Sequence, residues 1–263
     1  MPNAQSGFFE WVLFFIKTQG SLFLRGAGVT LLISLTGTIA GFIIGLAVGY
    51  VRARPLQKED GAGRYWLMKV VRAILGAYIE IFRSTPMIVQ AMVIFYGMSA
   101  VFHVNLPHLL AGYIIVSINT GAYLSEIVRG GIQSVDPGQM EAGIAIGMSY
   151  GQTMLSVVLP QAIRNILPAL GNEFVVNIKD TSVLNVIAVS ELYYASNDAA
   201  GTYLKFFEVF FITSVIYFIM TFTVTRILRW IEKKMDGPEN YVMHGSQTVP
   251  DVELVTKGAN EHA

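Results

Sequence analysis

The stretch VTLLISLTGTIAGFIIGLAVGYV, residues Val29–Val51, decides the fold because it contains no charged residue. A membrane-spanning helix needs about 20 mostly apolar residues, since backbone groups left unpaired in hydrocarbon are costly. The rest of the 263-residue chain agrees: 53% of it is hydrophobic and only 14% is charged, whereas soluble domains carry about 25% charged residues. The absence of cysteine excludes a disulfide scaffold, and a net charge of zero argues against a nucleic-acid binder. The sequence predicts an all-α polytopic membrane protein.

Further spans are predicted in stretches of sequence that lack charged residues. Residues 84–125 carry no Asp, Glu, Lys or Arg, and Asn105, Pro107 and two histidines interrupt them at Val101–His108. This pattern predicts two spans joined by a turn. A fourth span is expected in a segment broken by prolines and charges, followed by a short outer helix at Val183–Leu192. About five spans are predicted in all: Val29–Val51, Met87–Val101, Leu109–Ile127, Gln161–Ile178 and Phe206–Thr225.

The basic residues predict the orientation. Positive charge gathers in cytoplasmic loops, so the N-terminus is expected outside and the C-terminus in the cytoplasm. Only Lys17, Arg25 and Lys205 then face outward. The predicted cytoplasmic set is Arg52, Arg54, Lys58, Arg64, Lys69, Arg72, Arg83, Arg129, Arg164, Arg226, Arg229, Lys233, Lys234 and Lys257.

Three regions follow from this pattern. Residues 1–25 are predicted to form an interfacial segment rather than a signal peptide, because Glu10 interrupts their apolar run. In an amphipathic helix on the outer surface, Phe8, Trp11 and Phe15 would face lipid. Residues 26–230 form the predicted transmembrane domain, with Gln57–Trp66 as a cytoplasmic loop. Residues 231–263 are polar and are expected to form a flexible cytoplasmic tail.

The long cytoplasmic segment after the third span carries the first candidate site. Asp136-Pro137-Gly138 is typical of a helix start, with a capping carboxylate and a proline in the first turn. A short exposed helix is predicted from Glu141 to Met148, with small residues at 142, 143, 145 and 147. Such a helix suits insertion into a groove of another protein, although it could equally be a plain connector between two spans.

This segment resembles the EAA signature of ABC-importer permeases. Glu141-Ala142-Gly143, Gly147 and Leu159-Pro160 stand at the spacing of that signature; Gly143 replaces an alanine and Val157 an isoleucine. The resemblance implies a cytoplasmic coupling helix between spans three and four. The predicted ATPase-coupling residues are Met140, Glu141, Ala142, Gly143, Gly147 and Met148. Glu141 would be the anchoring charge, and Gly147 would permit close approach.

More of the chain resembles the polar-amino-acid branch of these permeases. The matching stretches are Phe82-Arg83-Ser84-Thr85-Pro86 with Gln90, Gly121–Ile132, and Lys179-Asp180-Thr181-Ser182 with Val186-Ile187 and Glu191-Leu192. The resemblance implies a bacterial inner-membrane subunit that pairs with a second copy or a paralogue. Its partners would be a cytoplasmic ATPase dimer, which binds ATP and magnesium, and an extracytoplasmic binding protein that delivers a polar amino acid. The chain has no Walker-type phosphate loop of its own, so it is expected to be a transport subunit without a cofactor rather than an enzyme.

Polar residues within the spans are candidates for the translocation pathway, because ionisable groups at membrane depth line watery routes or pair with one another. On the third span Asn119, Tyr123 and Glu126 share a face, and Thr120 lies beside them. The second set comes from the end of the fourth span: Glu173, Asn177, Lys179, Asp180, Thr181 and Ser182. Alternatively, Lys179 and Asp180 neutralise each other or Glu173 and merely hold a broken helix together.

Two smaller features complete the prediction. Glu80 and Arg83 either support the EAA region at the inner surface or form a local helical ion pair. His103 and His108 lack the additional ligands that a metal site requires. The rival functions left open are a secondary transporter, with Lys179, Asp180 and Glu126 as an ion relay, and a membrane scaffold without transport.

Overall fold

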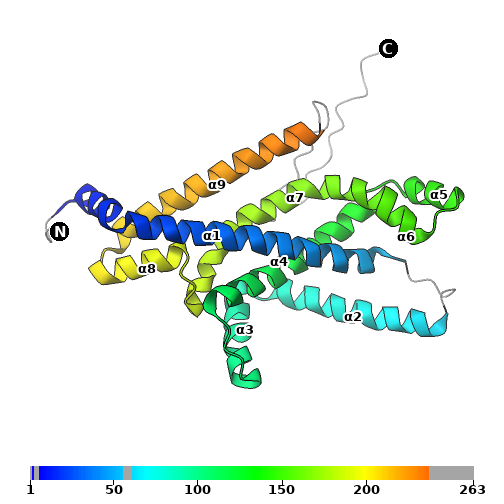
Figure 1. The fold of residues 1–263 in the computed structure, drawn as a ribbon, viewed down its shortest axis with the longest axis horizontal. Helices are drawn as coiled ribbons and strands as arrows, with labels where there is room; N and C mark the ends of the chain where they lie inside the picture. Colours follow the sequence, from blue (N-terminus) through cyan, green and yellow to red (C-terminus); the bar gives the residue numbers. More distant parts are fainter. Residues whose placement is uncertain (1, 3–5, 56–60, 237–263) are drawn as a thin grey trace, which may run out of the picture.

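The computed structural model describes residue 2 and residues 6–55 and 61–236. The regular structure in these ranges is helical, which confirms the predicted all-α class (Figure 1). The helices are α1 (Phe8–Ala53), α2 (Ala62–Ser84), α3 (Met87–Phe102), α4 (His108–Gln133), α5 (Pro137–Ala145), α6 (Tyr150–Thr153), α7 (Leu159–Asp180), α8 (Leu192–Tyr203) and α9 (Phe206–Asp236). A π-helical turn, Met154–Val158, leads into α7, and a 3₁₀ segment, Thr181–Ile187, follows it.

Long apolar helices confirm a polytopic membrane protein. Within the described residues three stretches are long and apolar enough to cross a membrane: Phe8–Ala53, Tyr150–Ile187 and Phe206–Lys234. Helices α2 and α3 together make a fourth candidate, bent by 116° at their junction. The expected third span, now α4, does not meet these criteria, since polar residues such as Asn119 and Glu126 dilute its apolar run.

A seam of glycines holds α1 against α4 at the centre of the fold. A Cβ added at Gly41 would lie 2.8 Å from Thr120 Cβ, and one added at Gly45 would lie 2.8 Å from Leu124 Cβ. Small residues at every fourth position let two helix backbones approach closely, which drives helix association in membranes. The facing pairs along the seam are Gly37 with Val116, Gly41 with Thr120, Gly45 with Leu124, and Gly49 with Val128.

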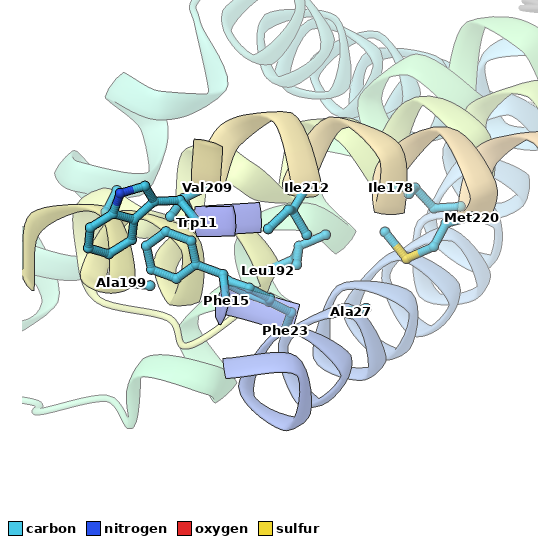
Figure 2. Close-up of a cluster of buried hydrophobic side chains, with 11 residues drawn as sticks. Trp11, Phe15, Phe23, Ala27, Ile178, Leu192, Ala199, Val209, Ile212 and Met220 are labelled. Carbon is cyan, nitrogen blue, oxygen red and sulfur yellow. The ribbon is translucent and has the colours of Figure 1, made fainter. Parts of the chain in front are cut away.

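The start of α1 packs on α8 and α9, and this corrects the predicted lipid-facing segment. Trp11 is 4% exposed and Phe15 is fully buried. Figure 2 shows their rings beside Ala199 of α8 and Val209 of α9. Phe8 is half-buried against Phe207 and Phe211. The prediction failed because α8, which supplies much of the covering surface, was not expected from the sequence.

Two element boundaries also differ from the prediction. Ala62–Trp66, expected in a loop, form the first turns of α2. The outer helix expected at Val183–Leu192 is a 3₁₀ segment, which Ala188 ends with a left-handed φ of 56°, and Leu192 instead begins α8.

The first residues of the predicted tail are helical. Helix α9 continues through Ile231 to Asp236, so the first residues of the region 231–263 are helical. The remainder, 237–263, lies outside the described residues, as do 56–60 of the predicted loop.

Candidate functional site

The segment with the EAA signature folds as a helical hairpin of α5 and α6. Its start is as predicted: the Asp136 carboxylate accepts a hydrogen bond of 2.8 Å from Gly138 N–H, and Pro137 occupies the first turn. At the second helix, Ser149 and Gln152 form a reciprocal capping box. Figure 1 shows α5 and α6 at the end of the molecule opposite α8 and the N-terminus. We call α5 to α6 the hairpin.

Gly147 ends α5 earlier than predicted. The helix stops at Ala145 rather than Met148, because Gly147 adopts a φ of +88°, which other residues rarely adopt. Met148 N–H donates to Gly143 O at 3.0 Å and Gly147 N–H to Ile144 O at 3.0 Å, the two bonds of a Schellman cap. A Cβ at Gly147 would meet no atom within 4 Å. Within the described chain the glycine serves to turn the backbone, and its predicted close approach to the ATPase stays a prediction.

Gly143 is the position of close approach instead. It is the buried residue of α5, and a Cβ there would lie 2.7 Å from Thr153 Oγ1 and 3.1 Å from Thr153 Cβ. Thr153 is itself fully buried and donates to Ser149 O at 3.1 Å. The replacement of alanine by Gly143 in the signature thus makes room for Thr153.

The outer surface of the hairpin is apolar with one charge. Ile144 is 51% and Ile146 is 80% exposed. Glu141, Ala142 and Ala145 are exposed on the same short helix. Met140 and Met148 are half-buried, and Met140 packs on a core cluster of α4 and α7. An exposed apolar tip on an anchored base is a surface shaped to contact a partner.

Several pathway candidates form hydrogen bonds between helices. Asn177 Nδ2 donates to Thr38 Oγ1 at 2.8 Å, and Thr120 Oγ1 donates to Asn177 Oδ1 at 3.1 Å, so α1, α4 and α7 share one buried network. Asn119 Nδ2 donates to Gln90 Oε1 at 2.8 Å. Gln90 in turn donates to Thr85 O at 2.8 Å and so fixes the bend between α2 and α3. All three predicted residues are buried within this chain.

Glu126 lies in an ion cluster near the hairpin end of α4. Arg129 Nη2 donates to Glu126 Oε2 at 2.7 Å, and Arg52 Nη1 of α1 pairs with Oε1. The Arg83 guanidinium lies 5.6 Å from the centre of the Tyr123 ring. The alternative of a local Glu80–Arg83 ion pair does not hold in the described residues, where Glu80 is exposed and unpaired.

The residues at the end of α7 separate into buried and exposed sets. Glu173 and Thr181 are buried, and Thr181 Oγ1 donates to Ile178 O at 3.0 Å. Lys179 and Asp180 are exposed and Ser182 is half-buried. Within the described chain Lys179 and Asp180 form no ion pair with each other. Lys179 lies on a hollow of about 380 Å³ between α7 and α9, also lined by Val175, Phe218, Thr221, Phe222, Thr225, Arg226 and Arg229.

A fully buried carboxylate, Glu191, was not identified as a site by the sequence prediction. It caps α8 by accepting from Tyr193 N–H at 2.8 Å and Tyr194 N–H at 2.7 Å, and it accepts from Tyr217 Oη of α9 at 3.1 Å. Thr30 of α1 donates to it at 3.4 Å. Because Ser, Thr, Asp and Asn are the preferred N-cap residues and Glu is not, no ordinary sequence signal marks this cap.

The described residues contain no group of three or more His, Cys, Asp or Glu that could hold a metal ion. His108 instead stacks on Phe95, with ring centres 5.2 Å apart, and its Nδ1 lies 2.8 Å from Ile187 O.

Known proteins are similar to this chain in sequence and fold. The chain is 35% identical over 215 residues to the glutamine transport system permease protein GlnP of Escherichia coli, covering 81% of this chain and 93% of that protein. It is 36% identical over 200 residues to the L-cystine transport system permease protein TcyB of Bacillus subtilis, covering 76% and 82%. A solved amino acid ABC transporter with histidines superposes with a TM-score of 0.74 at 33% identity, covering 88% of this chain and all of that one. The MetNI methionine ABC transporter, at 20% identity and a TM-score of 0.61, shares the fold.

The sequence profile described as binding-protein-dependent transport system inner membrane component matches residues 61–237. That span includes the hairpin, Glu126 and Arg129 of α4, and α7 to α9. Membership implies an ATPase that handles ATP and a binding protein as partners. The chain therefore belongs to the family of binding-protein-dependent transport system inner membrane components, as the permease subunit of an ABC importer.

Proposed function

We propose that this permease imports polar amino acids, as part of an assembly with a second permease copy or a paralogue. The supporting observation is its similarity, over about four fifths of the chain, to permeases named for glutamine and L-cystine transport. Five spans fit this role: α1, the bent α2–α3 pair, α4, α7 and α9, with the N-terminus outside and the C-terminus in the cytoplasm. Helices α2 and α3 are counted here as one broken span, because together they have the length and apolar composition of a span.

The hairpin is the proposed site of coupling to the ATPase dimer. The observation that carries this assignment is the exposure of Ile144 and Ile146 on a hairpin whose base is fixed by Met140 and Gly143. We call this exposed apolar surface of Ile144 and Ile146 the knob. It would fill a groove of the partner, and the charge of the exposed Glu141 would orient the contact. Ala142, Gly147 and Met148 shape the same knob. Because α4 runs into α5 after only three residues, Ser134, Val135 and Asp136, a push on the knob reaches a membrane helix directly.

The proposed pathway uses the polar groups that remain accessible. Tyr123, Glu126, Lys179, Asp180 and Ser182 keep exposed or half-exposed side chains, and both signs of charge are among them. A zwitterionic amino acid requires partners of both signs. Asn119, Thr120, Glu173, Asn177 and Thr181 are proposed to support this route from behind, because they are buried between helices.

Reconstitution tests the function. In liposomes containing the permease, its ATPase and the binding protein, adding a polar amino acid should raise ATP hydrolysis and drive uptake. The permease alone should show no uptake driven by an ion gradient; such uptake would favour a secondary transporter. Competition among labelled amino acids in the same liposomes identifies the substrate.

The coupling role has its own test. Ile146→Asp and Glu141→Lys should uncouple hydrolysis from uptake while the protein still inserts and folds. Glu10→Lys reverses an exposed acid in the first turn of α1, at the opposite end of the molecule, and serves as the control. Normal coupling in both hairpin variants would reject the knob as the contact.

A further inference from the structure

Three arginines gather where the end of α1, helix α2 and the start of α6 meet. Arg52 lies in the last turn of α1, Arg54 follows that helix, and Arg72 lies on α2. The Arg54 guanidinium is 5.7 Å from the centre of the Tyr150 ring, at the first residue of α6. We call Arg52, Arg54, Arg72 and Tyr150 the arginine cluster.

Arg72 is the unusual member of this cluster. Its Nε and Nη2 atoms are buried and have no hydrogen-bond partner within the part of the chain that the structure describes. Among the described residues, the ionisable groups that influence it are Tyr150, Arg52 and Arg54, none of which is a carboxylate. Burying donors of a charged group without acceptors is costly, so such donors are normally satisfied by something.

The neighbouring carboxylate, Glu126, cannot act as the missing acceptor for Arg72. Glu126 already accepts from both Arg52 and Arg129, so it is not free to pair with Arg72 as well. A guanidinium presents parallel N–H groups that match the oxygens of a phosphate. In the proposed orientation these groups lie at the cytoplasmic membrane surface, where basic pockets meet the headgroups of anionic lipids.

We propose that the arginine cluster binds a phosphate group, with the Nε and Nη2 atoms of Arg72 as its central donors. The headgroup phosphate of an anionic phospholipid has this chemistry, and so does inorganic phosphate. Because Tyr150 opens the second helix of the hairpin, a bound phosphate would brace the hairpin against α1 and α2. The orientation used here rests on the proposed function, whereas the binding itself can be measured without transport.

Native mass spectrometry tests the lipid source. The complete transporter is purified from nanodiscs of phosphatidylcholine mixed with phosphatidylglycerol, and retained phosphatidylglycerol is counted. Arg72→Gln should weaken retention at least about tenfold, because the hydrogen bonds from the buried guanidinium atoms to the phosphate are lost together with the charge. Lipid retention by Arg72→Lys should lie between those of the wild type and Arg72→Gln, because lysine keeps the positive charge but lacks the parallel N–H groups of the guanidinium. Arg64→Gln removes the same charge from an exposed position on α2 and should retain lipid like the wild type.

Thermal unfolding in phosphatidylcholine nanodiscs tests the other source. A rise in the wild-type midpoint on adding inorganic phosphate, absent in Arg72→Gln, would identify free phosphate as the ligand and support the cluster. Equal lipid retention in wild type, Arg72→Lys and Arg72→Gln, with no phosphate effect on the wild type, would overturn the proposal. An equal loss in Arg64→Gln and Arg72→Gln would also overturn it, because it would show only the effect of general surface charge.

Discussion

The contact between Gly143 and Thr153 yields the sharpest prediction. Gly143→Ala restores the alanine of the EAA signature, and in isolation it should favour the α5 helix by up to about 1 kcal/mol. In this chain, however, the new Cβ would lie 2.7 Å from Thr153 Oγ1 and 3.1 Å from Thr153 Cβ. Overpacking of this kind costs about 1–3 kcal/mol. We therefore expect a net destabilisation of the hairpin of up to about 2 kcal/mol, a change opposite in sign to the helix propensity.

Thr153→Ala supplies the compensating change. Alone it removes the hydrogen bond to Ser149 O, at a cost of about 1 kcal/mol. Combined with Gly143→Ala it also removes the colliding Oγ1 and Cγ2 atoms, so the double variant should be more stable than the sum of the single effects by about 1–2 kcal/mol.

Hydrogen–deuterium exchange of peptides covering residues 137–153 measures the effect where it occurs. Gly143→Ala should speed exchange in this segment and reduce substrate-stimulated ATP hydrolysis by the complete transporter, and the double variant should recover both. Slower exchange in Gly143→Ala than in the wild type would show that propensity outweighs the clash. Strictly additive effects in the double variant would show that the two residues are not in contact.

Two further predictions concern the membrane helices. Gly45→Ala should lower the thermal midpoint of the purified permease, because its Cβ would lie 2.8 Å from Leu124 Cβ and overpack the seam at a cost of about 1–3 kcal/mol. Gly28→Ala in the same helix is the control: its Cβ would meet no atom within 4 Å, so the midpoint should stay the same or rise. Equal midpoints for the two variants would refute the seam. Glu191→Gln should lower the thermal midpoint by an amount equivalent to about 1–3 kcal/mol, because the new amide NH₂ would face hydrogen-bond donors. Tyr217→Phe removes only one of these donors and should lower the midpoint less. An unchanged midpoint in Glu191→Gln would argue against the role of Glu191 as the cap of α8.

The sequence predicted the long apolar helices well because the membrane imposes one strong requirement on them. The fourth predicted span, Gln161–Ile178, lies within α7 (Leu159–Asp180) despite the internal Pro168. The helix predicted at Met87–Val101 has the bounds of α3 to within one residue, but α3 is a candidate span only together with α2, so its prediction as a separate span is wrong. Apolar length is a local property, so it can be read without knowing which helices are neighbours.

Features that depend on a neighbour were missed or misassigned. Trp11 and Phe15 have the pattern of a lipid-facing helix, and only the position of α8 reveals that they are covered. Asn177 and Thr120 have the polarity of pathway residues, yet each finds a partner on another helix. In hydrocarbon a polar group must be satisfied either by water in a route or by another helix, and a single sequence does not distinguish the two.

The helix joints also bear on how force would travel. The glycine seam interlocks α1 and α4 residue by residue, and the Arg52–Glu126 pair joins the same two helices near the hairpin. Interlocked helices cannot slide by small amounts, because packed interfaces switch between discrete arrangements. A force applied to α5 should therefore move α1 and α4 together as one rigid body.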